Sequence, residues 1–382
     1  MLRQLAQDPE LEMHVFYMSD MSVRGFDDPG FGVRVKWDVP LLGGYKHEFL
    51  RKIGDSKVTP LLRPLVIGLE ETFRKERLDA LWVHGYKHQA AIRALFAGWR
   101  MGIPTLVRGE SNGHDKNNDG FGCRVRNEVL RRLFQKIDAF LYVGKLNREF
   151  YLRKGVSPSK LFFMPYSVDN SFFQNAAREA SKSRSELLRE LNIPQGSPII
   201  LYSAKLLPWK RPLDLLEAYH RLLPEAPVDC TPYLVYVGDG SERERLQQRI
   251  NFLSLNSVRL VGFKNQSELP RYYEACDVFV LPSEREPWGL AVNEVLNAGK
   301  PVVVTDRLGC APDLVRNGES GFVVPVGDVA ALSSRLADLI RDRELRSRMG
   351  DAGKQIVSQF SYEQDIFGLK RALTQVCGKL PS

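Results

Sequence analysis

The chain has 382 residues, of which 43% are apolar and 26% are charged. This length and composition predict two or three folded domains and exclude a disordered, collagen-like or low-complexity chain. Lys and Arg exceed Asp and Glu by eight, and the whole excess lies in residues 1–165, which carry 27 basic and 19 acidic side chains, whereas residues 166–382 carry 27 of each. The first part therefore either attracts an anionic partner or presents a solvated basic surface.

The amino terminus and the cysteines bear on location and metal binding. The first ten residues, MLRQLAQDPE, lack the apolar stretch of a signal peptide, and the longest apolar runs fall far short of the roughly 20 residues that span a bilayer. The five cysteines follow neither CxxC nor metal-ligand spacing. We therefore expect a cytoplasmic protein with reduced thiols and without a metal or other cofactor. The basic first part leaves peripheral contact with the anionic inner face of a membrane open.

The first part of the chain alternates between short strand-like runs and helical patterns. The runs that predict strands are Glu12–Ser19, Ala80–Val83, Thr105–Arg108, Ala139–Val143 and 161–165. Between them, Arg124–Ile137 has apolar residues at every fourth position and arginines on the opposite side. This pattern predicts a basic amphipathic helix.

A second alternation follows a polar, small-residue stretch at 166–190, which we interpret as a linker. Its predicted strands are Pro198–Ser203, Pro232–Val237, Val258–Val261, Val278–Leu281, Pro301–Val304 and Gly321–Val324. They are apolar almost throughout, which is typical of a parallel sheet covered on both faces. The sequence therefore predicts an α/β fold of two doubly wound Rossmann-like domains, 1–165 and 191–361, that face a cleft. A C-terminal helix at 362–382 follows, and its packing back on the first domain is left open.

Two glutamates lie beyond the carboxyl end of a predicted strand, where ligands of such sheets bind. Glu286 ends the loop after this strand, and Glu294 lies eight residues later in a helix that begins near Gly289. In an apolar setting both carboxylates need a hydroxyl-rich or cationic partner, such as a sugar or a ribose, and the first amides of the helix suit a phosphate. Taken alone, this spacing fits a solvated helix face better.

A basic loop, SAKLLPWKRP, follows the first strand of the second part and carries Lys205, Lys210 and Arg211. Ammonium groups on such a loop suit a diphosphate. Two glycine turns, VGDGS at 237–241 and LVGF at 260–263, end the next two strands. There the backbone can approach a ligand closely, although each turn is also an ordinary strand-to-helix connection. The order of these features along one domain is the specific signal.

This order of motifs resembles that of the retaining glycosyltransferases of family 4, which are group 1 glycosyltransferases with the GT-B fold. The matching stretch runs from about Ile199 to Tyr362 and contains AKLLPWKRP, VGDG, VGF, the E-x7-E motif EPWGLAVNE and LGCAPDLVRNGESGFVVP. The resemblance implies an enzyme whose second domain binds a nucleotide sugar.

The resemblance also implies roles for donor-binding residues. Lys205 and Lys210 would hold the diphosphate, and Glu294 would bind the ribose hydroxyls. Gly289 and Leu290 would give backbone amides to the phosphate or the sugar.

The catalytic residues implied by the resemblance are Glu286, which would bind the hydroxyls of the transferred sugar near the reacting centre, and His84. The sequence WVHGYKH after a predicted strand is similar to the histidine-bearing loop of the family, although a lone histidine at a strand end is as often structural. The stretch Val107–Lys116 takes the place of another cleft loop. Arg108 and Glu110 are its candidate acceptor-side residues, and a surface salt pair is the alternative interpretation.

Three features depart from the family pattern. The family usually has Arg in place of Lys205 and Gly in place of Arg211, so we assign Arg211 to the phosphates only weakly. The sequence also opens on what looks like the first helix running into the second strand. The first strand and its glycine-rich turn, which face the donor phosphates in the family, are therefore expected to be missing. A late start codon, a truncated gene or a protein that does without this element would each explain that.

We therefore expect a metal-independent retaining glycosyltransferase that moves a hexose-type sugar from a UDP or GDP donor to a glycan or lipid-linked acceptor, anionic in keeping with the basic first domain, as in polysaccharide biosynthesis. Other GT-B enzymes, such as a nucleotide-sugar epimerase or a phosphorylase, are the nearest alternatives. A catalytically impaired nucleotide-sugar-binding protein belongs to another class. Nucleic acid is not an expected partner, because the sequence has no recognised nucleic-acid motif.

Overall fold

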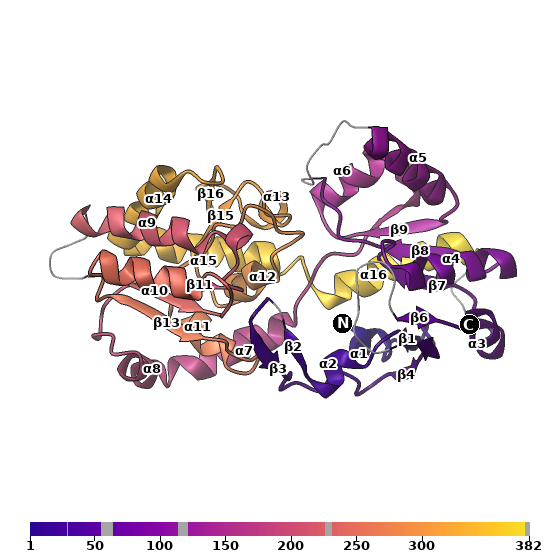
Figure 1. Cartoon of the computed structure of the whole chain (residues 1–382), viewed down its shortest axis with the longest axis horizontal. Coiled ribbons are helices and arrows are strands. Elements are labelled where there is room, and N and C mark those ends of the chain that lie inside the picture. Colours follow the sequence, from indigo (N-terminus) through magenta and orange to yellow (C-terminus); the bar gives the residue numbers. More distant parts are fainter. Residues whose placement is uncertain (29, 55–63, 114–120, 226–230, 379–382) are drawn as a thin grey trace. The chain divides into compact units, whose positions relative to one another are not determined.

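The computed structural model describes residues 1–28, 30–54, 64–113, 121–225 and 231–378. The chain divides into two compact units (Figure 1). Unit 1 contains Met1–Gly25, Pro40–Tyr166 and Tyr362–Ser382, and unit 2 contains Phe26–Val39 and Ser167–Ser361.

Unit 1 is built around a parallel sheet of four strands in the order β10-β9-β8-β7. The strands of unit 1 are β1 (His14–Tyr17), β4 (Lys46–Phe49), β5 (Lys52–Ile53), β6 (Leu65–Val66), β7 (Leu81–His84), β8 (Thr105–Arg108), β9 (Ala139–Tyr142) and β10 (Leu161–Phe163). Its helices are α1 (Leu2–Leu5), α2 (Met21–Arg24), α3 (Leu69–Glu76), α4 (Gln89–Met101), α5 (Phe121–Gln135), α6 (Lys145–Arg153), the 3-10 turn η1 (Pro158–Lys160) and α16 (Tyr362–Cys377). Each strand and the basic helix predicted in this part lie on an observed element.

Two pairings in unit 1 go beyond the prediction. The strand expected at Glu12–Ser19 forms β1, which pairs with β4 in a two-stranded parallel sheet of its own. The C-terminal helix α16 crosses back to unit 1, where Leu369 and Leu373 pack with core residues of the four-stranded sheet. Gly368 allows this approach, because a Cβ there would meet the carbonyl oxygen of Phe163 at 1.9 Å.

Unit 2 contains a parallel sheet of six strands in the order β13-β12-β11-β14-β15-β16. The strands of unit 2 are β2 (Phe26–Asp28), β3 (Val33–Val35), β11 (Ile199–Ser203), β12 (Tyr233–Val237), β13 (Val258–Gly262), β14 (Val278–Leu281), β15 (Val302–Thr305) and β16 (Gly321–Val324). Its helices are α7 (Asn170–Ser181), α8 (Arg184–Glu190), η2 (Pro208–Lys210), α9 (Pro212–Leu222), η3 (Leu223–Glu225), α10 (Arg243–Phe252), α11 (Leu269–Ala275), α12 (Leu290–Asn297), α13 (Ala311–Leu314), α14 (Val329–Arg341) and α15 (Arg343–Val357).

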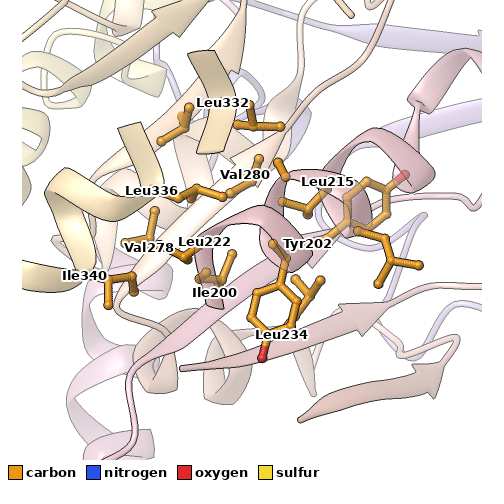
Figure 2. Close-up of a cluster of buried hydrophobic side chains, with 14 of the residues drawn as sticks. Ile200, Tyr202, Leu215, Leu222, Leu234, Val278, Val280, Leu332, Leu336 and Ile340 are labelled. Carbon is orange, nitrogen blue, oxygen red and sulfur yellow. The ribbon is translucent and has the colours of Figure 1, made fainter. Parts of the chain in front are cut away.

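The core of unit 2 explains why its strands are apolar at almost every position. Side chains of a strand alternate between the two faces of a sheet. Ile200 and Val280 join the cluster beneath α9 and α14, which Figure 2 shows. The alternate residues Leu201 and Phe279 are also buried, so helices cover both faces. The predicted doubly wound sheet is thereby confirmed.

The strand order places a topological switch point between β11 and β14. The chain leaves the centre of the sheet in one direction through β12 and β13, and in the other through β15 and β16. Crevices outside the carboxyl ends of the two central strands are the usual ligand sites of such sheets. Here the loops that follow β11 and β14 carry the basic motif and the first glutamate of the E-x7-E motif.

The stretch 166–190, expected as a linker, is mostly helical. Asp169 caps α7 by accepting a 2.8 Å hydrogen bond from the amide of Phe172. Helix α7 then packs against α11 and α12 and buries Ala177. Because the outer side of this helix consists of polar and small residues, the composition of the stretch indicated a linker and not a packed helix.

A second difference concerns a segment of the amino-terminal part. Strands β2 and β3 form an antiparallel hairpin in which Phe26 pairs with Val35 and Asp28 with Val33. The hairpin and the residues after it, Phe26–Val39, belong to unit 2, although residues on both sides of them in sequence belong to unit 1. No local sequence pattern indicates that Phe26–Val39 belong to unit 2.

Candidate active site

The basic loop after β11 is fixed by backbone contacts with the VGDG turn after β12. The amide of Leu206 donates to the carbonyl of Asp239 over 2.8 Å, and the amide of Ala204 to that of Val237 over 3.1 Å. Gly238 and Gly240 have positive φ values of 138° and 151°, and a Cβ on either would clash with the carbonyl of Ala204 or Leu206. These glycines therefore hold the lysine-bearing loop in place.

Lys210 and Glu286 form an ion pair between the loops after β11 and β14. Their side chains are only 16% and 15% exposed. Burial, and in addition the positive charge of Lys205, lowers the pKa of Lys210 to about 8. The ammonium groups of Lys205 and Lys210 therefore lie at the same end of the sheet. A further anion beside them would stabilise the charged forms of both lysines.

The loop that carries Glu286 is clamped by the LGC segment after β15. The amide of Gly309 donates to the carbonyl of Glu286, and the amide of Cys310 to that of Trp288, each over 3.0 Å. Gly309 fits because a Cβ there would lie 1.8 Å from the carbonyl of Pro287. The LGCAPD part of the sequence therefore positions the glutamate.

Helix α12 begins directly after this loop. Gly289 precedes it with a φ of 104°, a conformation that favours glycine, and α12 runs through Leu290–Asn297. The first amides of a helix lack intrahelical acceptors and lie at the positive end of its dipole. Leu290 is 41% exposed. The start of α12 and Lys210 therefore offer hydrogen-bond donors for an anion. Glu286, beside them, offers a carboxylate for hydroxyl groups.

Glu294 lies one turn further along α12 and contacts a residue that the sequence analysis missed. The hydroxyl of Tyr273, from α11, donates a 2.6 Å hydrogen bond to Oε2 of Glu294. Burial raises the pKa of Glu294 to about 7, although the bond from Tyr273 opposes the shift. A buried tyrosine hydroxyl usually needs a hydrogen-bond partner, but the sequence alone does not indicate that Glu294 is the partner of Tyr273.

Lys205 and Arg211 are both paired with carboxylates. Nζ of Lys205 lies 2.8 Å from Oδ1 of Asp28, in the hairpin β2–β3. Arg211 has a left-handed φ of 51°, which accounts for the glycine that the family usually has there. Its guanidinium binds Asp214 at 2.6 Å and lies 3.7 Å from Glu284. Arg211 therefore contacts carboxylates of this chain, and its weak assignment to the phosphates stays a prediction.

The residues expected from the first domain lie together in unit 1. His84 and Arg108 are neighbours at the carboxyl ends of β7 and β8. His84 is exposed by its surface area, but desolvation by the surrounding protein atoms, and secondarily the charge of Arg108, lowers its pKa. Glu110 is exposed and accepts a hydrogen bond from the hydroxyl of Tyr166. Residues 114–116 of the expected loop lie outside the described residues.

Arg108 differs from both interpretations made from the sequence, because its side chain is buried within unit 1. It is 5% exposed, donates to the carbonyl oxygens of Met164 (3.2 Å) and Pro165, and lies 3.4 Å from the fully buried Asp365 of α16. Its ring neighbour is Tyr166, 5.0 Å from the guanidinium carbon. Arg108 therefore links the C-terminal helix to the sheet. Because the side chain is buried, Arg108 neither forms a surface salt pair nor lies open to an acceptor.

Asp365→Ala should lower the stability of unit 1 by about 3 kcal/mol, because it leaves the Arg108 cation buried without its carboxylate. Denaturant unfolding measures this loss. Arg371→Ala, which removes an exposed charge of the same helix, is the control and should change the stability by less than about 0.5 kcal/mol. Equal effects of the two substitutions would contradict the proposed tie.

Glu294→Gln should stabilise unit 2 at pH 8 by about 1–3 kcal/mol. Glu294 has a higher pKa folded than unfolded, so the folded state binds the extra proton and stability falls as pH rises from about 4.5 to about 7. The glutamine avoids this loss, and its advantage should shrink as the pH falls and vanish at about pH 4, below the unfolded pKa. Thermal unfolding at both pH values, with the exposed Glu244→Gln as the control, tests the sign. A gain that is equal at both pH values would refute the raised pKa.

Within residues 1–28, 30–54, 64–113, 121–225 and 231–378, no three His, Cys, Asp or Glu side chains are grouped so that they could hold a metal ion. None of the helices in these ranges is both long and apolar enough to cross a bilayer.

Comparison with known families covers both units. Residues 183–356 match the sequence model of the glycosyl transferases group 1, and residues 7–167 match that of the glycosyl transferase 4-like domain. The first match contains the basic loop, both glutamates and the LGCAPD segment.

Curated relatives share a quarter to a third of the aligned residues. N-acetyl-alpha-D-glucosaminyl L-malate synthase of Bacillus anthracis is 26% identical over 303 residues, which cover 78% of this chain and 74% of that protein. D-inositol 3-phosphate glycosyltransferase of Thermobifida fusca is 32% identical over 225 residues, which cover 57% of this chain and 50% of that protein. The match therefore spans only half of the second relative.

Solved structures share the fold over nearly the whole chain. Anabaena HepE in complex with UDP has a TM-score of 0.73 with 18% identity, and the alignment covers 98% of this chain and 94% of that one. Sucrose-phosphate synthase from Thermosynechococcus elongatus has a TM-score of 0.69 with 20% identity, covering 99% and 91%. At these identities the likeness concerns the fold alone.

Proposed function

Because this chain belongs to the group 1 glycosyltransferases with the GT-B fold, we propose that it is a retaining glycosyltransferase that moves a hexose-type sugar from a nucleoside diphosphate donor to an acceptor. The observation that carries the proposal is the convergence of Lys210, Glu286 and the start of α12 at the switch point of unit 2. Cations and helix amides at one point suit a diphosphate, and the carboxylate beside them suits sugar hydroxyls.

Each donor-binding residue has a separate task in this proposal. Lys205 and Lys210 bind the diphosphate, and the amides of Gly289 and Leu290 complete its surroundings. Glu294 accepts from the ribose hydroxyls, with its orientation fixed by the 2.6 Å bond from Tyr273. We propose UDP or GDP as the nucleotide, and the UDP bound by Anabaena HepE favours testing UDP first.

The chemistry is largely electrostatic. The bond between the anomeric carbon and the diphosphate oxygen breaks while the acceptor oxygen bonds to the same face of the sugar, and the proton of the acceptor hydroxyl passes to the departing diphosphate. Lys205, Lys210 and the helix amides stabilise the negative charge that develops on the diphosphate. Glu286, and His84 at the end of β7, are the proposed catalytic contacts with the transferred sugar. Independence of a metal stays a prediction.

The acceptor is proposed to be a glycan or lipid-linked molecule with negative charge. The names of the two curated relatives contain malate and inositol 3-phosphate, both anionic. In this chain Arg124 and Arg126 lie exposed on the basic helix α5, whereas Arg131 and Arg132 each donate a 2.8 Å bond to Glu128. Glu110 remains the candidate acceptor-side residue, and contact with an anionic membrane stays a prediction.

The decisive experiment is a thermal-shift panel of nucleoside diphosphates, followed by turnover of the matching nucleotide sugars with and without EDTA. We expect one diphosphate to raise the unfolding temperature, its sugar to be consumed in the presence of EDTA, and NMR to find the donor's anomeric configuration in the product. Binding without turnover would favour the nucleotide-sugar-binding alternative. Interconversion of the donor into another nucleotide sugar would favour an epimerase, and absence of binding would refute the donor site.

Nucleoside diphosphate binding should weaken above pH 8, because only the protonated form of Lys210 attracts the diphosphate and burial lowers its pKa to about 8. We expect the dissociation constant to be nearly constant up to about pH 7, to be about twofold higher at pH 8 and then to rise by up to about tenfold per pH unit. Calorimetry measures it. Lys210→Arg, which stays charged, should remove the pH dependence. A flat profile of the unaltered protein up to pH 9.5 would contradict the assignment.

Glu286→Gln should lower kcat by about a hundredfold or more, because its proposed partner is the transferred sugar. The affinity for the free diphosphate should stay equal or rise, since Lys210 loses its competing carboxylate. Steady-state kinetics and calorimetry on the same preparation separate these effects. Weaker diphosphate binding with unchanged kcat would assign Glu286 to the nucleotide.

A further inference from the structure

The hairpin β2–β3 places a carboxylate on a cation of the proposed diphosphate site. Both oxygens of Asp28 face Lys205, with Nζ at 2.8 Å from Oδ1 and 2.9 Å from Oδ2. The side chain of Asp28 is 13% exposed and that of Lys205 is 33% exposed. The pair is therefore partly shielded from water, where an ion pair is stronger than on an open surface.

Backbone donors hold the Asp28 carboxylate in this position. The amides of Gly30 and Phe31 donate to Oδ1 over 2.7 and 3.0 Å. Burial alone would raise the pKa of Asp28, but the bonds from Lys205 and from these two amides outweigh it and lower the pKa. Asp28 is thus an anion held by three donors. This environment is what a phosphate oxygen would also require.

Three further contacts near Lys205 fix the hairpin to the rest of unit 2. The ring of Phe31 packs edge-on against Phe263 of the VGF turn, with centroids 4.8 Å apart. The ammonium of Lys205 lies 4.6 Å from the centroid of the Phe31 ring. A Cβ on Gly240 would lie 2.9 Å from the carbonyl oxygen of Gly30, so the VGDG turn also touches the hairpin.

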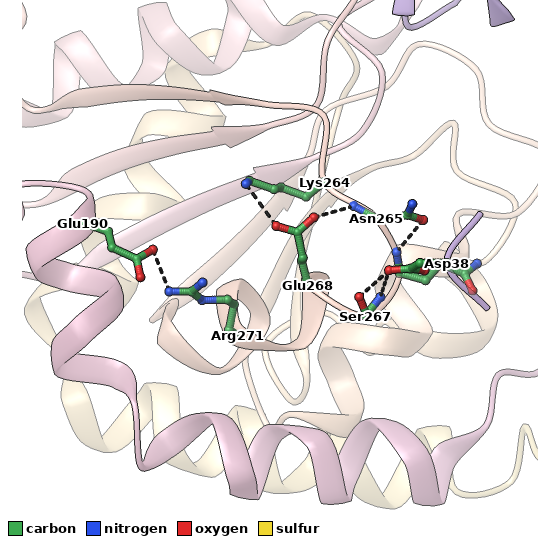
Figure 3. Close-up of polar contacts among 8 residues, drawn as sticks. Asp38, Glu190, Lys264, Asn265, Ser267, Glu268 and Arg271 are labelled. Atoms are coloured by element: carbon green, nitrogen blue, oxygen red, sulfur yellow. Dashed lines mark hydrogen bonds and ion pairs between the residues drawn. The ribbon is translucent and has the colours of Figure 1, made fainter. Parts of the chain in front are cut away.

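The segment after the hairpin is anchored separately, beyond the end of β13 (Figure 3). Nδ2 of Asn265 donates to the carbonyl oxygen of Lys36 over 2.7 Å. Both the amide of Ser267, over 3.2 Å, and its hydroxyl donate to Oδ2 of Asp38. Figure 3 shows Asp38 facing Asn265 and Ser267. The rest of unit 2 therefore holds the hairpin at Asp28 and Phe31, and also holds the segment after it at Lys36 and Asp38.

We propose that Asp28 is a built-in competitor of the donor's diphosphate, a carboxylate that occupies Lys205 until a nucleoside diphosphate displaces it. The proposal rests on the proposed function, in which Lys205 binds the diphosphate. Asp28 and a phosphate oxygen cannot both remain close to one ammonium without repelling each other. The hairpin consequently lowers the affinity for the diphosphate, both in the donor and in the released product. Any nucleotide base gives the same effect, because the contact involves only the phosphate.

Asp28→Asn is the direct test, with calorimetric binding of UDP and GDP as the readout. Removal of the charge should tighten binding of the preferred diphosphate by about tenfold and leave binding of the corresponding nucleoside unchanged. Asp27→Asn is the matched control, because it removes an equal charge from the adjacent, exposed position of the same strand. It should leave both affinities unchanged.

A double-mutant cycle with Lys205→Ala tests whether the effect passes through the proposed contact. In the Lys205→Ala background, Asp28→Asn should no longer tighten binding. A full gain that persists without Lys205 would overturn the proposal, as would a Asp28→Asn protein that binds the diphosphate equally or more weakly than the unaltered protein. Failure of the unaltered protein to bind any nucleoside diphosphate would instead refute the proposed function.

Asp38→Ala provides a second test of the proposal if the Asp28→Asn protein does not fold. It removes the acceptor for Ser267 at the far anchor of the hairpin and leaves Asp28 and Lys205 intact. A loosened hairpin competes less, so diphosphate binding should tighten by about two- to fivefold with the nucleoside unaffected. Unchanged or weaker diphosphate binding would overturn the proposal.

Discussion

The candidate site depends on one electrostatic constraint, the presence of two ammonium groups at the same end of a buried parallel sheet. Burial makes Lys210 costly to charge, and repulsion from Lys205 adds to this cost, so that the pKa of Lys210 falls to about 8. Each ammonium is compensated by a carboxylate of the chain, Asp28 or Glu286. A bound diphosphate would supply the same compensation from outside. The loops around the pair serve to hold these charges at fixed places.

That constraint explains why so many glycines and backbone bonds converge on the site. Gly238 and Gly240 let the turn after β12 press against the lysine loop, and Gly309 lets the LGC segment press against the glutamate loop. The amide of Glu284 donates to the carbonyl of Trp209 over 2.8 Å, which joins the two loops directly. A charged cluster that is fixed in advance needs no rearrangement when charge develops during a reaction.

Unit 2 could be predicted well from sequence because its signals are local. Strands buried on both faces are apolar at almost every position, and the charged motifs follow them at short, fixed distances. The pairing of Tyr273 with Glu294 and of Asp28 with Lys205 could not be predicted, since it joins residues that are 21 and 177 positions apart. Nothing local distinguishes Asp28 from its exposed neighbour Asp27. Long-range pairing likewise buries Arg108 against Asp365, 257 positions away.

The hairpin shows that unit 2 is not one continuous stretch of sequence. Residues 26–39 enter unit 2 from the amino-terminal part, and the chain then returns to unit 1 until Tyr166. A boundary drawn at the change in composition near residue 166 separates Lys205 from its carboxylate. The site therefore takes its lysines from one part of the sequence and the carboxylate of Asp28 from the other. Any change in how the hairpin packs changes whether Lys205 is available to a ligand. A segment remote in sequence thus acts directly on the affinity of the site.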